Sequence, residues 1–388
     1  MPTPDRRQPL IQDALRTTNP HRGLLIFACV YACLVVHLSL FPYVNWRSIG
    51  IGPFEFVLGP WVPIHQTLLW ADIIVNVAGY LPLGFCLALG TSRSVRSRDV
   101  LLVGVVCLGL SFSVEALQTY LPTRVPSKMD VLTNVMGGVL GALLAVALTA
   151  RNPWVAGLNR RLESWLIDRA WLGALLLVLW FLAILPPQNP PFSMGFWLGN
   201  LFDIPGPQIQ STPFGLPASF ILQVEQWAPN VLNYCWLMCA WLIGLAQTQS
   251  GSPRLRMVLV LIAITVLLRS LEGLILFPVD AWVYQSGLWL GAHGAGLFLA
   301  VLAAVAVSFE RLAPHHLARL SLLHLVVGWS LTLLLPGVYD PDLTVRGPGW
   351  IGLFRSLQEA GRWISELWPI LALTILIFLS RPEARFRR

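Results

Sequence analysis

The chain has 388 residues, of which 56% are hydrophobic and only 12% charged, and its net charge is +7. With a mean hydropathy of +0.67 it carries more apolar surface than one soluble core buries, which excludes a soluble globular protein. The basic residues form no stripe interleaved with aromatic side chains, so we expect no nucleic-acid partner.

Ten apolar runs of about 18 to 24 residues are long enough to cross a hydrocarbon core of about 30 Å. Open strands leave backbone groups unsatisfied in hydrocarbon, and the runs are too long for barrel strands, so we expect helices. The sequence thus predicts an all-α, polytopic integral membrane bundle of about ten transmembrane helices. In chain order the runs lie near residues 23–41, 70–90, 99–121, 130–150, 168–185, 230–247, 256–277, 286–308, 317–337 and 362–380.

The basic residues also predict the topology. If the N-terminus is cytoplasmic, most of the 26 Lys and Arg residues lie on the inner side, and the 186–229 connection contains none. Both termini are then cytoplasmic. The first run is followed by Pro42 rather than by a small-residue cleavage site, so we expect it to be retained as a helix. The six cysteines lie inside predicted spans without a Cys-x-x-Cys pair, as packing residues do.

Polar side chains recur at helical spacing in the second, third and fourth predicted spans. In the topology above they meet in the outer third of the bilayer, and basic residues of the following outer loop approach them. Ionisable and amide groups are costly in hydrocarbon unless they are paired or hydrated, so this cluster is the candidate functional site. It comprises Asp72, Asn76 and Tyr80 in the second span, Glu115 and Gln118 in the third, Arg124 and Lys128 in the loop, and Asp130 and Asn134 in the fourth.

Structural roles are the alternative for most of these residues. Asp72 and Asp130 stand at helix N-termini, where a carboxylate caps free N–H groups. The amides serve equally well as hydrogen bonds between helices, and the two basic residues as contacts at headgroup level. Glu115 is expected to lie too deep to cap a helix. It should therefore pair with Arg124, share a proton or hold an ion, which makes it the candidate catalytic acid or base.

Small residues and a weak internal repeat organise the rest of the chain. Gly137, Gly138, Gly141, Ala142 and Ala145 predict close helix packing. Segment 115–141 aligns with segment 272–296, where Gln285 and Trp289 replace Asp130 and Asn134. We therefore predict a cytoplasmic segment at 1–22, a four-helix unit with the polar site at 23–150, a degenerate second unit at 151–310, and two further helices with a basic tail at 311–388.

One ordered set of motifs carries a family resemblance. It consists of D-x-x-x-N-x-x-x-Y-x-P-x-G from Asp72 to Gly84, Glu115-x-x-Gln118, Arg124, and Asp130-x-x-x-Asn134-x-x-Gly137-Gly138. Over residues 23–150 this pattern resembles the VanZ-like family of bacterial membrane proteins. The resemblance implies a multi-pass protein of the inner (cytoplasmic) membrane, with a cell-envelope role linked to glycopeptide (teicoplanin) resistance, and it specifies no reaction. Lys128 and Met129 separate Arg124 from Asp130, which is a departure from the family pattern.

Three functions from different classes remain open. In the first hypothesis the cluster binds the polar headgroup of an envelope lipid or glycolipid in the outer leaflet. A stronger form of this hypothesis is that the protein also processes the headgroup. Alternatively the protein is a transporter or flippase, or a non-catalytic membrane scaffold. We expect no metal site, because no His-x-x-x-His pair occurs and the histidines His293, His315, His316 and His324 are scattered. Ligand, cofactor, catalysis and oligomeric state stay undetermined at this level.

Overall fold

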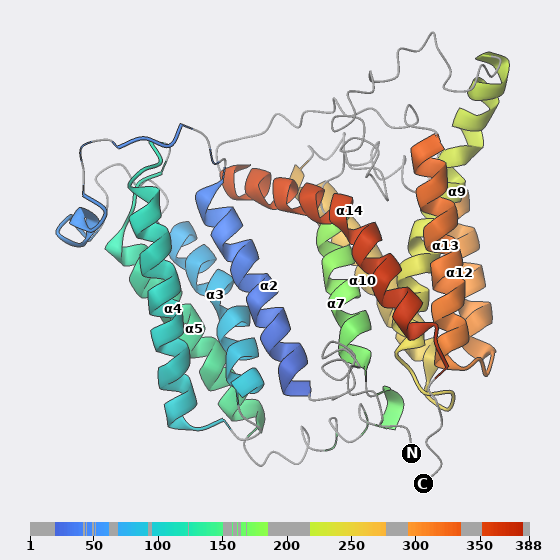
Figure 1. Ribbon diagram of the computed structural model, residues 1–388, viewed down its shortest axis with the longest axis horizontal. Helices are drawn as coiled ribbons and strands as arrows, with labels where there is room; N and C mark the ends of the chain where they lie inside the picture. Colours follow the sequence, from blue (N-terminus) through green and yellow to red (C-terminus); the bar gives the residue numbers. More distant parts are fainter. Residues whose placement is uncertain are drawn as a thin grey trace, which may run out of the picture. The chain divides into compact units, whose positions relative to one another are not determined.

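The computed structural model describes residues 20–41, 43, 45–48, 50, 52–61, 69–91, 95–122, 124–149, 157, 161, 164–167, 169–184, 218–276, 294–334 and 351–382. Within these residues the fold is all-helical, with ten α-helices, one 3-10 turn and no β-strand beyond a single isolated bridge (Figure 1). Each α-helix coincides with one predicted apolar run, so the predicted fold class is confirmed.

The chain divides into two compact units, Met1–Arg161 and Leu162–Arg388. The predicted four-helix unit lies within the first. The finer domain division and the repeat stay predictions, since Gln285 and Trp289 lie outside the described residues. The first unit contains α2 (Pro20–Leu40), η1 (Glu55–Val57), α3 (Leu69–Thr91), α4 (Ser97–Gln118) and α5 (Lys128–Thr149), and the second contains α7 (Ala170–Ala183), α9 (Ala218–Ala246), α10 (Arg254–Leu276), α12 (Gly294–Phe309), α13 (Pro314–Leu334) and α14 (Ile351–Leu379).

Among the described residues, four helices are long and apolar enough to cross a membrane, and all four belong to the first unit. Their apolar segments are Gly23–Leu40, Asp72–Thr91, Ser97–Gln118 and Lys128–Thr149. Shorter apolar segments of the second unit are Ala170–Ala183, Asn230–Ala246, Gly294–Phe309 and Ile364–Leu379. The protein is therefore a membrane protein, whereas the exact number of crossings and the side on which the termini lie stay predictions.

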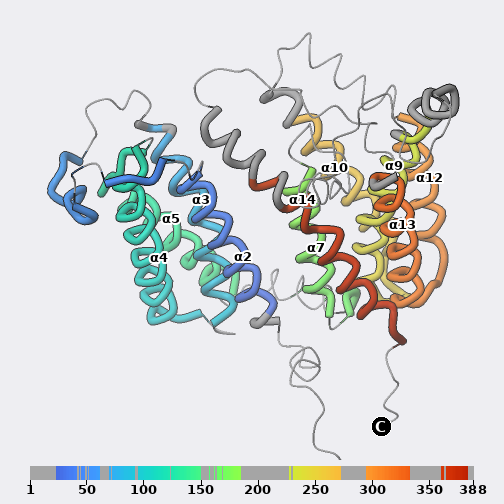
Figure 2. The backbone as a smooth tube through the Cα atoms, turned by 45° about the horizontal axis from the view of Figure 1, so that its top comes forward, coloured from blue at the N-terminus to red at the C-terminus, as the bar shows by residue number. Residues whose placement is uncertain are grey.

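In the first unit α3 and α5 form the central pair, with α2 packed on α3 and α4 packed on α5 (Figure 2). Glycines permit this close approach. A Cβ atom on Gly84 would meet the carbonyl of Gly138, and one on Gly141 would meet the carbonyl of Leu81. The predicted small-residue packing face is thus confirmed, and it brings the polar residues of α3 and α5 near one another.

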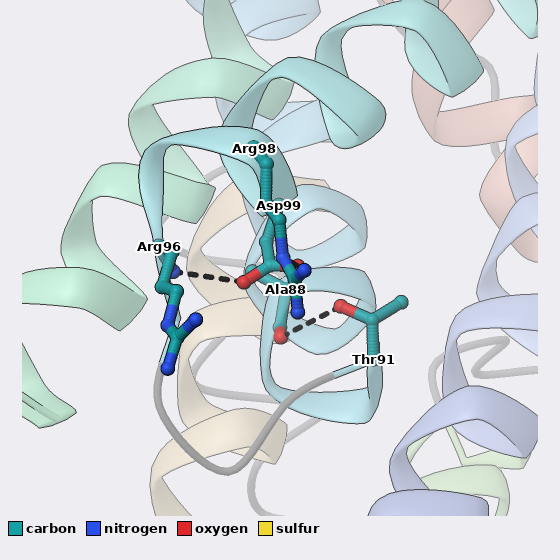
Figure 3. Close-up of polar contacts among 5 residues, drawn as sticks. All are labelled: Ala88, Thr91, Arg96, Arg98 and Asp99. Carbon is teal, nitrogen blue, oxygen red and sulfur yellow. Dashed lines mark hydrogen bonds and ion pairs between the residues drawn. The ribbon is translucent and has the colours of Figure 1, made fainter.

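Local hydrogen bonds determine where α3 ends and α4 begins (Figure 3). The Thr91 hydroxyl donates to the Ala88 carbonyl at 3.1 Å in the last turn of α3. The backbone N–H of Arg96 donates to Asp99 Oδ2 at 2.8 Å, which caps the start of α4. Asp99 is therefore a buried carboxylate with a purely local role, at the opposite end of α4 from Glu115.

In the second unit α9 is central, with α12 and α13 packed on it, while α14 packs on α7. Three tryptophans join these helices. The ring centroids of Trp180 and Trp236 lie 5.7 Å apart, those of Trp236 and Trp368 lie 5.1 Å apart, and Trp368 Nε1 donates to the Leu176 carbonyl at 2.9 Å. These contacts are typical of an aromatic core.

Candidate functional site

Carboxylate and amide side chains of α3, α4 and α5 gather into one cluster. Asp130, in the first turn of α5, lies within interaction range of the Asn76 side chain of α3 and within electrostatic range of Asp72. Glu115 of α4 lies within electrostatic range of Asp130. The structure thus brings together three carboxylates from three helices, as the helical spacing predicts.

Glu115 caps a helix other than its own. Its side chain is 3% exposed, and Oε2 accepts a hydrogen bond from the backbone N–H of Ser127 at 2.7 Å. Ser127 directly precedes α5, and its own hydroxyl accepts from the Met129 N–H at 3.1 Å. The expectation that Glu115 lies too deep to cap a helix is therefore wrong. The start of α5, the next helix, packs against α4 at the level of Glu115, so the carboxylate reaches a free N–H there.

Arg124 lies at the edge of the cluster. The structure describes both Arg124 and Glu115, and the two side chains form no direct ion pair. The guanidinium donates to the carbonyls of Leu38 at 3.1 Å and Phe41 at 2.8 Å, at the C-terminal end of α2. Burial lowers the pKa of the Arg124 guanidinium from its ordinary value, and the charge of Glu115 opposes that shift. Arg124 thus holds α2 against the loop that follows α4 and faces Glu115 at longer range.

Beneath the carboxylates lie polar atoms whose hydrogen bonding is incomplete. Asn134 Nδ2 donates to the hydroxyl of Ser111 at 3.0 Å, whereas Asn134 Oδ1 is buried and has no hydrogen-bond partner. The Tyr80 hydroxyl is also buried, and it lies beside Ser111 without a well-aligned hydrogen bond. A buried oxygen that accepts no hydrogen bond from the protein is expected to accept one from a water molecule or a ligand.

Two of the predicted site residues point away from the cluster. Gln118 Nε2 donates to the Ser39 carbonyl of α2 at 2.9 Å. Lys128 Nζ donates to the Val57 carbonyl at 3.2 Å and lies 4.7 Å from the ring centroid of Trp61. The cluster therefore consists of Asp72, Asn76, Tyr80, Ser111, Glu115, Asp130 and Asn134, with Arg124 at its edge.

Comparison with known families places these helices in one of them. Residues 25–149 match the model of the family described as VanZ/LLP1. This part of the chain is a VanZ-like domain. The match extends over α2, α3, α4 and α5, so the resemblance seen in the polar motifs is confirmed. No curated protein and no solved structure matches the chain.

Two residues of the VanZ-like domain were missed at the sequence level, Ser111 within the cluster and Ser127 beside it. Ser111 precedes Glu115 by one helical turn, so the same spacing argument that selected Glu115 selects it too. Ser127-x-x-Asp130 is the pattern of a capping box before an apolar run, which predicts Ser127 as the first cap of α5. Serine is common in membrane helices, so a serine alone does not indicate a functional site.

The cluster is rich in hydrogen-bond acceptors. In the part of the chain that the structure describes, no three His, Cys, Asp or Glu side chains converge in a way that would hold a metal. Ionised carboxylates and the amide oxygen of Asn134 only accept hydrogen bonds. A group that brings hydroxyls or an ammonium would therefore complement the cluster.

Proposed function

We propose that the VanZ-like domain binds the polar headgroup of a bacterial envelope lipid or glycolipid, in the leaflet next to the C-terminal end of α4. In the predicted topology this is the outer leaflet of the inner membrane. The observation that carries the proposal is the buried, unpartnered Oδ1 of Asn134 beneath three neighbouring carboxylates. Such groups are costly in hydrocarbon without a partner, so a bound donor explains why they occur together.

The surrounding charges favour a ligand rich in donors. The nearby cation, Arg124, is already engaged by two backbone carbonyls, so it only partly offsets the negative charge that Asp72, Glu115 and Asp130 carry when they are ionised. The hydroxyls of a sugar or the ammonium of an amino-lipid would supply the missing donors. The proposed link to glycopeptide resistance follows from this role, since a protein that binds envelope lipid alters the surface at which such antibiotics act.

Native mass spectrometry of the purified protein tests the proposal. The parent should retain an envelope lipid, and the variants Asp130→Asn and Glu115→Gln should lose it. Asp99→Asn is the matched control, because Asp99 is a buried carboxylate of the same helix α4 that caps only its own helix end. Equal lipid occupancy in all four proteins would overturn the headgroup proposal and favour a scaffold. Chemical processing would show as a mass change of the retained lipid over time.

A further inference from the structure

The connection between α2 and α3 carries large apolar side chains that the protein leaves uncovered. Within residues 52–61, Phe54, Val57, Leu58 and Trp61 are all exposed, and the exposed fraction of Leu58 reaches 87%. Four such residues within eight positions form a contiguous apolar patch, which in a loop marks an interaction surface.

The loop runs alongside α4 instead of standing above it. The ring of Phe54 stacks on that of Phe112 with centroids 5.7 Å apart, and the ring of Phe56 lies 5.4 Å from the same ring. Phe112 precedes the last residue of α4, Gln118, by six positions, which places it about 9 Å below the helix end. Because α4 is long and apolar enough to cross a membrane, the rings of Phe54 and Phe56 pack on a part of the helix that we expect lipid to surround.

The fold of the loop suits that environment. Phe56 is buried against the protein, so it anchors the loop while Phe54, Val57 and Leu58 stay outside. The backbone closes on itself, since the N–H of Leu58 donates to the Glu55 carbonyl at 2.9 Å and that of Gly59 to the Phe56 carbonyl at 3.2 Å. Such internal bonds lower the cost of moving a loop out of water.

We propose that residues 52–61 insert into the leaflet next to the C-terminal end of α4 as an interfacial loop, with lipid acyl chains covering Phe54, Val57 and Leu58. The loop and the spanning helix α4 both expose apolar side chains, and Phe54 joins the two by stacking on Phe112. Glu55, the one charged residue in the segment, is exposed and limits the insertion to the headgroup boundary. Lys128 binds the Val57 carbonyl and lies over Trp61, a pairing typical of the membrane interface.

This inference holds whether or not the polar cluster binds a headgroup. It predicts where one surface of the VanZ-like domain meets lipid, and it would explain the aromatic content of residues 52–61.

A fluorescent probe at Leu58 tests the insertion. Leu58→Cys, in a full-length variant without native cysteines, is labelled with an environment-sensitive dye and reconstituted in nanodiscs whose phospholipids carry a nitroxide on the acyl chain. Leu108→Cys, exposed halfway along α4, is the lipid reference, and Arg98→Cys, exposed at the other end of α4, is the aqueous reference. We expect the probe at position 58 to be quenched to at least half the extent seen at position 108.

Two results would overturn the proposal. The first is a probe at position 58 that emits as in water and responds to aqueous iodide as position 98 does. The second is blue-shifted emission without quenching by the nitroxide lipids, which would mean that protein rather than lipid covers the loop. Leu58 is exposed, so its replacement should leave the thermal unfolding midpoint unchanged, and a measured midpoint equal to that of the parent confirms that the labelled protein is folded.

Discussion

Glu115 of α4 accepts a 2.7 Å hydrogen bond from the backbone N–H of Ser127, the residue immediately before α5. The bond joins the last turn of one helix to the start of the next and uses only Oε2 of the carboxylate. Glu115 therefore has a structural role through one oxygen, while the proposed functional role depends on its charge. The two roles are separable, because an amide oxygen accepts the same hydrogen bond.

Glu115→Gln should abolish lipid binding while the protein inserts and melts like the parent. The glutamine Oε1 still accepts from Ser127, and a neutral amide costs less to bury than a carboxylate. Native mass spectrometry measures the lipid, and thermal unfolding in detergent measures the stability.

Glu115→Ala serves as the comparison for this variant. It removes the acceptor from Ser127, so we expect it to lower the free energy of unfolding by about 1 to 3 kcal/mol. A Gln variant that is both stable and fully active would refute the acid, base and ion-binding roles of Glu115 together. The helix cap would then be the whole function of the residue.

The second prediction separates a cap from a binding group at Asp72 and Asp130. Asparagine caps a helix about as well as aspartate, so Asp→Asn should be almost silent if capping is the only role. We expect each variant to reach normal membrane abundance and to lose the bound lipid, because Asp130 lies between Asp72 and Glu115 in the carboxylate group. Full lipid occupancy in both variants would leave capping as the only role of these residues.

Helical spacing predicts much of the site because it fixes which residues share a face. The four-residue steps from Asp72 to Tyr80 and from Asp130 to Asn134 suffice to place these side chains on the faces where α3 and α5 meet. Hydrophobic length likewise predicts the ten α-helices found among the described residues. These are local properties, and a single sequence contains them in full.

Helical spacing could not predict the hydrogen-bond partners of Gln118, Arg124 and Lys128. Each binds a backbone carbonyl more than 70 residues away, on α2 or in the η1 loop, and a carbonyl leaves no signature in the sequence. The bond from Ser127 to Glu115 was missed for a related reason, since it depends on where the first turn of α5 lies against α4. Tertiary backbone placement, not side-chain type, decides these contacts.

The third prediction concerns the glycine contact between α3 and α5. Gly141→Ala places a Cβ against the carbonyl of Leu81, so the two helices must separate, and we expect a loss of about 1 to 3 kcal/mol in stability. Gly109→Ala on α4 is the control, because a Cβ there meets nothing within 4 Å. Thermal unfolding of both in detergent decides the point. An equal midpoint for Gly141→Ala and the parent would show that the packing tolerates a methyl group.

The final prediction concerns topology, and the structure decides which residue can report it. The loop after α4 holds Ser127, but that side chain is only 4% exposed and caps α5, so a cysteine there would label poorly and disturb the fold. Val125 in the same loop is 69% exposed and suits the experiment. In a background without native cysteines, Val125→Cys should react with an impermeant maleimide in intact cells, because the arginine distribution predicts that this loop lies outside. Ser97→Cys, exposed at the opposite end of α4, should react only after lysis. The reverse pattern would invert the topology and move the carboxylate cluster to the cytoplasmic leaflet. An envelope lipid confined to the outer leaflet would then be out of its reach.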